Sequence, residues 1–196
     1  MKSLAIEREY GSGGREIGTK VAKLCNIPYY DEELLLESAK EQGVSVDMLR
    51  YYDEKRTGSF LYDLANFSNY TLTSRHNIYD LFSGMARTIE NLAKKGPSIF
   101  IGRCSTEILK DNPKVLRVFI YSSDMEKRVQ RIMRIENTTS DNARKLIDKN
   151  DKERQNYFKS FTNKDWKDRN NYEMELNSAT LSSDECAEIL SRIIQQ

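Results

Sequence analysis

Residues 8–17 read REYGSGGREI and place three glycines, Gly11, Gly13 and Gly14, within one short turn. Glycine adopts positive φ without a steric penalty, so such a run can turn its main-chain amides inward around an anion. The first turn of a following helix adds unpaired N–H groups and positive dipole charge. The stretch therefore predicts a phosphate-binding turn. An ordinary strand-to-helix connection without a ligand is the alternative.

The residues on either side of the turn supply the context that a phosphate site requires. Residues 3–6 are apolar and predict a short buried strand, while Ile17, Val21, Leu24 and Cys25 recur at helical spacing and predict one buried helix face. Strand, loop and helix in this order are the setting of a phosphate-binding loop. We expect the nucleotide to be held by Gly11, Ser12, Gly13, Gly14, Arg15, Glu16 and Ile17.

The turn departs from the usual G-x-x-x-x-G-K-[ST] pattern. Aligned on Gly14, it has Glu9 at the first glycine and Arg15 at the lysine, followed by an acidic residue at the hydroxyl position. A frame that begins at Gly13 recovers a hydroxyl in Thr19 but loses the cation. We prefer the first frame, in which Arg15 supplies a fixed positive charge with a planar set of donors.

Strand and helix signals alternate along the rest of the chain, which predicts an α/β domain with a mostly parallel sheet. Capping-box patterns, in which a serine is followed three residues later by Glu, mark two helix starts, at Ser123 and Ser182. Further strands are expected at residues 98–101, 115–121 and 172–176, and further helices from 85 to the Gly-Pro at 96–97, at 123–136, at 140–160 and at the end of the chain.

Composition limits the classes of protein to which the chain can belong. Its 196 residues fit one domain, and no apolar stretch approaches the length of a membrane helix or of a secretory signal core, so we expect a cytoplasmic protein without a membrane partner. A net charge of +1 argues against a nucleic-acid-binding module. Three separated cysteines and a single histidine argue against a disulfide framework and a histidine-rich metal site.

The chain resembles the cytidylate kinase-like family, within the P-loop group of nucleoside monophosphate kinases. The resemblance rests on the glycine-rich turn through Gly18, on IPYYD at 27–31, on GRC at 102–104 and on residues 151–166. It implies a three-layer core with a five-stranded parallel sheet, an inserted helical region that holds the acceptor, and an arginine-bearing lid. The expected single domain spans 1–196, with the core at about 1–30, 84–135 and 170–196, the insertion at 31–83 and the lid at 134–165.

The resemblance implies transfer of the γ-phosphoryl group of ATP, with Mg²⁺, to a nucleoside monophosphate such as CMP or dCMP. Phosphoryl transfer depends on charge stabilisation, so arginines are expected around the transferred group. A solvated basic face, with Asp151 and Arg154 as a surface ion pair, is the alternative. The arginines expected to act in catalysis are Arg15, Arg131, Arg134, Arg144 and Arg154.

Two residues are expected on the acceptor side. Arg103 follows a predicted buried strand, where ligands of open α/β sheets bind, and the resemblance gives it the acceptor's phosphate. Asp31 can orient the acceptor's sugar or base, and it equally suits the N-cap of a following helix. No Mg²⁺ ligand is assigned, although Glu9, Glu16 and Asp124 carry suitable oxygens.

A second hypothesis is a catalytically inactive or regulatory nucleotide-binding protein of the same fold. It is motivated by Arg15 and Glu16, which stand where a lysine and a hydroxyl usually neutralise the phosphates and hold Mg²⁺.

Overall fold

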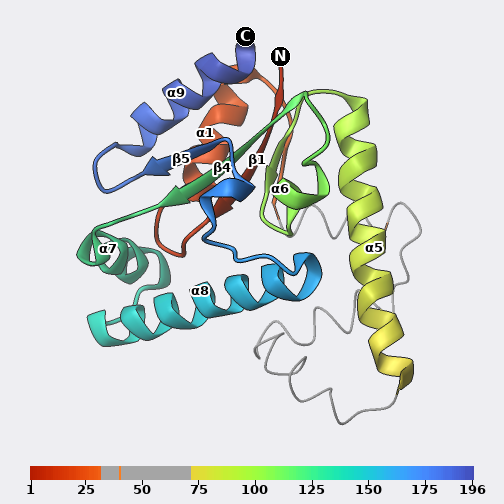
Figure 1. The fold of residues 1–196 in the computed structure, drawn as a ribbon. Coiled ribbons are helices and arrows are strands. Elements are labelled where there is room, and N and C mark those ends of the chain that lie inside the picture. The colour runs from red at the N-terminus through yellow and green to blue at the C-terminus, as the bar shows by residue number, and fades with distance from the viewer. Residues whose placement is uncertain (32–39, 41–71) are drawn as a thin grey trace.

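The computed structural model describes residues 1–31, 40 and 72–196. Within these residues, five strands form one parallel sheet in the order β2-β3-β1-β4-β5 (Figure 1). The strand pairing confirms the predicted α/β fold with a five-stranded parallel sheet. The strands are β1 (Ser3–Arg8), β2 (Tyr29–Tyr30), β3 (Ile99–Ile101), β4 (Val115–Tyr121) and β5 (Met174–Asn177).

Helices cover both faces of the sheet and complete the three layers. Helices α1 and α9 lie side by side on one face, and α5 runs along the other, with the short α6 beside it (Figure 1). Parallel strands need such crossovers, because each strand must return to the same end of the sheet. The helices are α1 (Gly14–Cys25), α5 (Leu72–Lys95), α6 (Ser105–Ile108), α7 (Met125–Glu136), α8 (Ser140–Thr162), α9 (Ser183–Gln195) and the 3₁₀ turn η2 (Arg169–Asn171).

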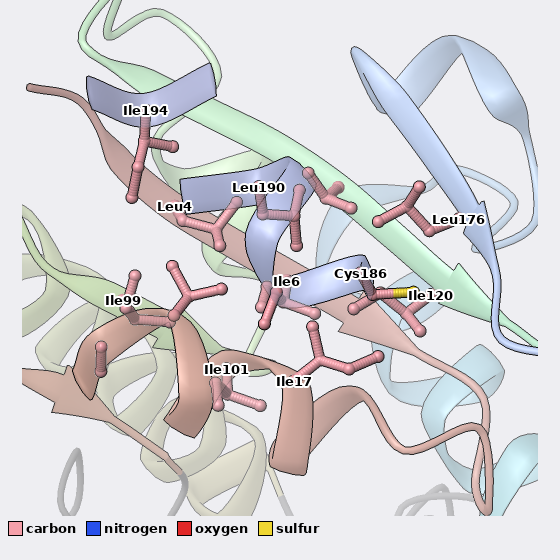
Figure 2. Close-up of a cluster of buried hydrophobic side chains, with 14 of the residues drawn as sticks. Leu4, Ile6, Ile17, Ile99, Ile101, Ile120, Leu176, Cys186, Leu190 and Ile194 are labelled. Atoms are coloured by element: carbon pink, nitrogen blue, oxygen red, sulfur yellow. The ribbon is translucent and has the colours of Figure 1, made fainter. Parts of the chain in front are cut away.

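The central strand β1 is buried on both faces. Leu4 and Ile6 point toward α1 and α9, where they pack in one cluster with Ile17 and Leu190 (Figure 2). Ala5 faces the opposite side and packs in the cluster formed with α5. Burial on both faces explains why this strand is a continuous apolar run instead of an alternating one.

A third cluster attaches α8 to the sheet. Trp166, which follows α8, is fully buried and meets Phe119 of β4 edge to face, with their ring centroids 5.1 Å apart. Phe158 of α8 is buried in the same cluster, and the Tyr172 hydroxyl donates a hydrogen bond to the Trp166 carbonyl at 2.6 Å. The C-terminal half of α8 is therefore anchored to the core.

One expected helix cap is wrong. Helix α7 is capped by Asp124, whose carboxylate accepts from the main-chain amide of Glu126 at 2.9 Å, and not by Ser123. The Ser123 hydroxyl instead accepts from the Asn177 side chain at 2.9 Å. The carboxylate of Asp124 stands one residue nearer the helix and accepts the hydrogen bonds that a capping serine would.

Most other local expectations are confirmed, with different bounds for some elements. The predicted strand at 115–121 coincides with β4, and the capping box of Ser182 with Glu185 opens α9. Helix α5 begins at Leu72, earlier than expected. The expected insertion at 31–83 lies mainly outside the described residues, and its last part, from residue 72, belongs to α5.

Leu24 is wrongly expected in the core. Its side chain is 56% exposed, whereas the adjacent Cys25 packs against the sheet. The buried face of α1 runs through Ile17, Val21 and Cys25, which are spaced four apart.

Leu24 and Leu190 provide a matched pair for testing the core. We expect Leu190→Ala to lower the free energy of unfolding by about 2 to 5 kcal/mol, because it leaves a cavity between α9 and the sheet. Leu24→Ala should change it by less than about 0.5 kcal/mol, since this side chain lies at the surface. Urea unfolding of both variants measures the difference, and equal losses would contradict the assigned packing.

Candidate active site

The glycine-rich turn joins the carboxyl end of β1 to the start of α1. Gly11 and Gly13 have φ values of +81° and +85°, and α1 begins at Gly14 with Gly13 as its N-cap. No described side chain caps this helix, so its first amides face the turn without a protein acceptor at the cap. An uncapped start after two left-handed glycines is a geometry that suits an anion.

The residues expected to hold the nucleotide fall into two groups, which differ in whether their main-chain amides are already hydrogen-bonded within the turn. Ser12 and Ile17 are buried, and their amides donate within the turn, to the carbonyls of Glu9 at 3.3 Å and Gly13 at 2.9 Å. The amides of residues 13–16 form the first turn of α1 and have no partner within the helix. Any anion at this turn would therefore be held by residues 13–16.

The glycines also allow arginine side chains to lie directly against the turn. A Cβ at Gly14 would lie 2.6 Å from the Cβ of Arg8, closer than real Cβ contacts. A Cβ at Gly13 would lie 3.0 Å from the guanidinium carbon of Arg131. Because these two positions carry no side chain, Arg8 and Arg131 can lie close to the place where the phosphates are expected.

The turn opens into a cavity of about 890 Å³ at the carboxyl ends of β1 and β3. Its size falls in the range of small-molecule sites. Of the predicted residues, it brings together the glycine turn, Arg15, Asp31, Arg131 and Arg154. Six basic side chains line it against four acidic ones, so the balance of charge favours an anionic ligand: Arg8, Arg15, Lys20, Lys23, Arg131 and Arg154 against Glu9, Glu16, Asp31 and Glu136.

Arg15 and Asp31, expected in different roles, bind each other. Arg15 Nη2 donates to Asp31 Oδ2 at 2.5 Å, and the Tyr29 hydroxyl lies 3.4 Å from the same oxygen. Asp31 is buried, whereas the Arg15 side chain is 67% exposed. This ion pair links the glycine-rich turn to Asp31, which directly follows β2.

Glu16 holds Arg131 beside the turn. The carboxylate forms an ion pair with Arg131, and Lys20 lies 3.2 Å from it. Burial alone would raise the pKa of Glu16, but hydrogen bonds from Arg131 and Lys20 outweigh it and lower that pKa. Glu16 therefore stays ionised and fixes the arginine that packs on Gly13.

Arg128 connects the turn to α8, a role that sequence reasoning did not single out. Its side chain is 5% exposed and donates to the Tyr10 carbonyl at 2.8 Å, to Glu9 at 3.2 Å and to Asp151 at 2.5 Å. Asp151 also accepts from the Tyr10 amide at 2.7 Å. Asp151 thus pairs with Arg128, in contrast to the surface pair with Arg154 considered as an alternative.

Arg154 reaches the turn from α8. Its Nη1 donates to the Arg8 carbonyl at 2.9 Å, and its guanidinium lies 5.3 Å from the centre of the Tyr10 ring. The Tyr10 hydroxyl donates to Glu136 at 2.8 Å, and burial together with this hydrogen bond raises the pKa of Tyr10 to about 12. Arg154, which is expected to act in catalysis, therefore lies in the cavity wall.

The sequence model of the cytidylate kinase-like family matches residues 3–180 of the chain. The chain belongs to the cytidylate kinase-like family. No curated protein matches it. The solved structure of an uncharacterised protein from Eubacterium ventriosum ATCC 27560 is similar over 100% of this chain and 99% of that chain, with a TM-score of 0.76 and 26% identity.

Solved kinases share the fold of this family member. Shikimate kinase from Acinetobacter baumannii has a TM-score of 0.51 at 14% identity, with 100% of this chain and 94% of that chain covered. A gluconokinase from Sinorhizobium meliloti 1021 has a TM-score of 0.50 at 14% identity, with 99% and 94% covered. At these identities the likeness shows the fold alone, which is that of P-loop small-molecule kinases.

Three other predicted arginines of this cytidylate kinase-like chain lie outside the cavity lining. Arg103 has a φ of +58° and its guanidinium lies 5.3 Å from the ring centre of Tyr157. Arg144 forms an ion pair with Glu126 in which both side chains are exposed, and Arg134 is exposed on α7. The structure does not bring these three together with the turn.

Buried Arg128 and exposed Arg134 of α7 allow a matched test of the network. We expect Arg128→Met to lower the free energy of unfolding by about 3 to 5 kcal/mol, because it leaves the carboxylates of Glu9 and Asp151 without this cation. Arg134→Met should cost less than about 0.5 kcal/mol. Urea unfolding at neutral pH compares them, and a small loss for Arg128→Met would show that Arg128 adds little to the stability of the fold.

Glu7 is a buried carboxyl on β1, next to the aromatic cluster. Trp166 Nε1 donates to its Oε2 at 3.3 Å. Burial raises the pKa of Glu7 above its ordinary value of 4.5, and the positive charges of Arg8 and Arg154 and the Trp166 hydrogen bond offset this only in part.

A carboxyl whose pKa is raised on folding binds more protons in the folded chain. The free energy of unfolding then falls as the pH rises from the unfolded-chain pKa through the folded one. We expect Glu7→Gln to lose this dependence, so its stability relative to the parent should grow between about pH 5 and about pH 8. Urea unfolding at both pH values tests this, with Glu188→Gln on the exposed side of α9 as the control. Parallel curves for parent and Glu7→Gln would refute it.

Proposed function

We propose that the chain is a small-molecule kinase that transfers the γ-phosphoryl group of ATP to a nucleoside monophosphate such as CMP or dCMP. The observation that carries the proposal is the uncapped start of α1 after Gly13, open to a cavity in which basic side chains outnumber acidic ones. Membership of the cytidylate kinase-like family and the kinase fold support it.

In this proposal the donor and acceptor bind on opposite sides of the turn. The amides of residues 13–16 and Arg131 bind the triphosphate, and Arg15 places a positive charge between the two sites through its bond to Asp31. Asp31 orients the acceptor, and Arg103 binds its phosphate. The residues that touch the transferred group only stabilise charge, so no covalent intermediate with the protein is expected.

Mg²⁺ fits this site only as part of the nucleotide complex. The described residues contain no group of three or more metal-ligating side chains. Glu9 accepts from Lys167 at 2.8 Å, Glu16 is paired with Arg131, and Asp124 caps α7. Mg²⁺ typically keeps several waters and binds through substrate phosphates, which would supply its remaining ligands here.

The proposed lid at 134–165 contains a fixed part and a part that can move. Asp151 is bonded to the turn and Phe158 is buried in the core, so movement is restricted to residues before Asp151. Arg134 and Arg144 lie in that earlier part, and we propose that closure brings them to the phosphates.

A cytoplasmic site of action completes the proposal, and the three cysteines, all free and buried, suit a reducing compartment. None of the helices in residues 1–31 and 72–196 combines the length and apolar character that a membrane span requires.

One observation favours a second candidate, a catalytically inactive or regulatory nucleotide-binding protein. Arg15 stands at the expected lysine position, yet it is bonded to Asp31 and largely exposed. A turn that binds ATP without a correctly placed cation would hold the nucleotide and not transfer its phosphoryl group.

A phosphoryl-transfer assay with ATP and Mg²⁺ against a panel of nucleoside monophosphates tests the proposal, together with calorimetry of ATP binding. We expect turnover with CMP or dCMP, and we expect Arg15→Ala to reduce it about tenfold or more, a larger loss than the one it causes in the stability of the fold. Arg169→Ala, an exposed arginine of η2, is the matched control.

Binding of ATP without turnover of any monophosphate would support the inactive protein and reject the kinase. Equal turnover in parent and Arg15→Ala would remove Arg15 from the mechanism.

A further inference from the structure

Arg8 occupies an unusual position between two glycines. It is the last residue of β1, its side chain is 15% exposed, and it lines the cavity. A Cβ at Gly14 would lie 2.6 Å from Arg8 Cβ, and a Cβ at Gly102 would lie 2.1 Å from Arg8 Nη1. Both separations are shorter than atoms tolerate, so Arg8 keeps this conformation only while both positions are glycine.

The start of α1 suggests a different frame for the turn from the one preferred in the sequence analysis. The usual motif has glycine at its first and sixth positions and lysine at its seventh. Counted with Gly13 as the sixth residue, the motif covers residues 8–14, with Arg8 at the first glycine and Gly14 at the lysine. Compared with the usual motif, the cation and the glycine have exchanged places. The aliphatic part of the Arg8 side chain occupies the space where a side chain at position 14 would begin.

We propose that Arg8 provides the positive charge that the lysine of the usual motif provides, and that it does so from the opposite end of the turn. This inference rests on the proposed function, which supplies the identity of the phosphate. The guanidinium lies against Gly102, just past the end of β3, while the stem lies under Gly14. It therefore stands between the donor turn and the strand end at which the acceptor is proposed to bind.

The chemistry of arginine suits this position. A guanidinium is always charged and carries five donors in a planar fork, so it can contact oxygens of two phosphoryl groups at once. The bond from Arg154 Nη1 to the Arg8 carbonyl at 2.9 Å ties the main chain of Arg8 to α8. The buried Glu7 carboxyl lies 4.0 Å from Arg8 Nη1.

Arg15 is less suited to the same task. Its side chain is 67% exposed and is bonded to Asp31 at 2.5 Å. Arg8 is enclosed by the turn and the end of β3, where a fixed charge acts in a medium of lower dielectric constant and is worth more.

The test uses the reciprocal exchange. Calorimetry measures binding of ATP with Mg²⁺, and separately of tripolyphosphate, to four proteins: the parent, Arg8→Gln, Gly14→Lys and the double variant Arg8→Gly with Gly14→Lys. Gln keeps most of the Arg8 stem and removes its charge. We expect Arg8→Gln to weaken both ligands about 10- to 100-fold, as expected for the loss of charged hydrogen bonds.

The double variant separates a phosphate contact from a structural role. Gly14→Lys alone should bind poorly or fail to fold, since its side chain meets Arg8. The double variant carries the complete G-x-x-x-x-G-K pattern, and we expect it to recover tripolyphosphate affinity to within about tenfold of the parent. Thermal unfolding of each protein reports on folding independently.

The outcomes distinguish the two proposals. Equal affinities of parent and Arg8→Gln for tripolyphosphate would overturn the role of Arg8 alone. A parent that binds tripolyphosphate and not ATP would overturn the proposed kinase function and leave the role of Arg8 to be decided by the variants. A parent that binds neither ligand would overturn both.

Discussion

The site depends on close contact between arginine side chains and a main chain that carries no side chains of its own. Arg8 lies under Gly14, Arg131 lies on Gly13, and the Arg128 main chain and Cβ lie against Gly11. Each contact would be lost if the turn carried a Cβ at that position. The glycines therefore have two functions, since they allow the left-handed backbone and they also admit the cations.

These arginines are held by carboxylates that belong to the turn and the start of α1 or to α8. Glu16 pairs with Arg131, while Glu9 and Asp151 pair with Arg128. Paired charges of this kind cost less to bury than single ones, because each ion offsets the desolvation of the other. The arrangement places positive charge at the turn, and basic side chains still outnumber acidic ones in the cavity lining.

Much of the fold was predictable from sequence, because its signals are local. The β-branched and aromatic run at 115–121 gave a strand with the observed bounds, and the glycine turn marked the junction of β1 and α1. Leu24 was wrongly placed in the core because it lies at the edge of the buried face of α1. At this edge Cys25 is buried and Leu24 is exposed.

The site was less predictable, because its contacts join residues that are distant in sequence. Arg128 meets Glu9 across the fold, and nothing in the spacing of the α7 arginines indicates which of them is buried. The position of Arg8 becomes informative only when Gly102 is known to lie against its guanidinium. Sequence could thus name the chemistry of the pocket, namely arginines around a glycine turn, but not which arginine stands where.

Helix α7 and the first part of α8 share a small core of their own, formed by Val129, Ile132, Ala143 and Ile147. Tyr10 of the turn packs against the same cluster, so this small core joins the two helices to the turn. Helix α7 carries both Arg131, which lies on Gly13, and Arg128, which bonds Glu9. A substitution that loosens the cluster would therefore disturb two cation contacts of the turn at once, although neither arginine belongs to the cluster.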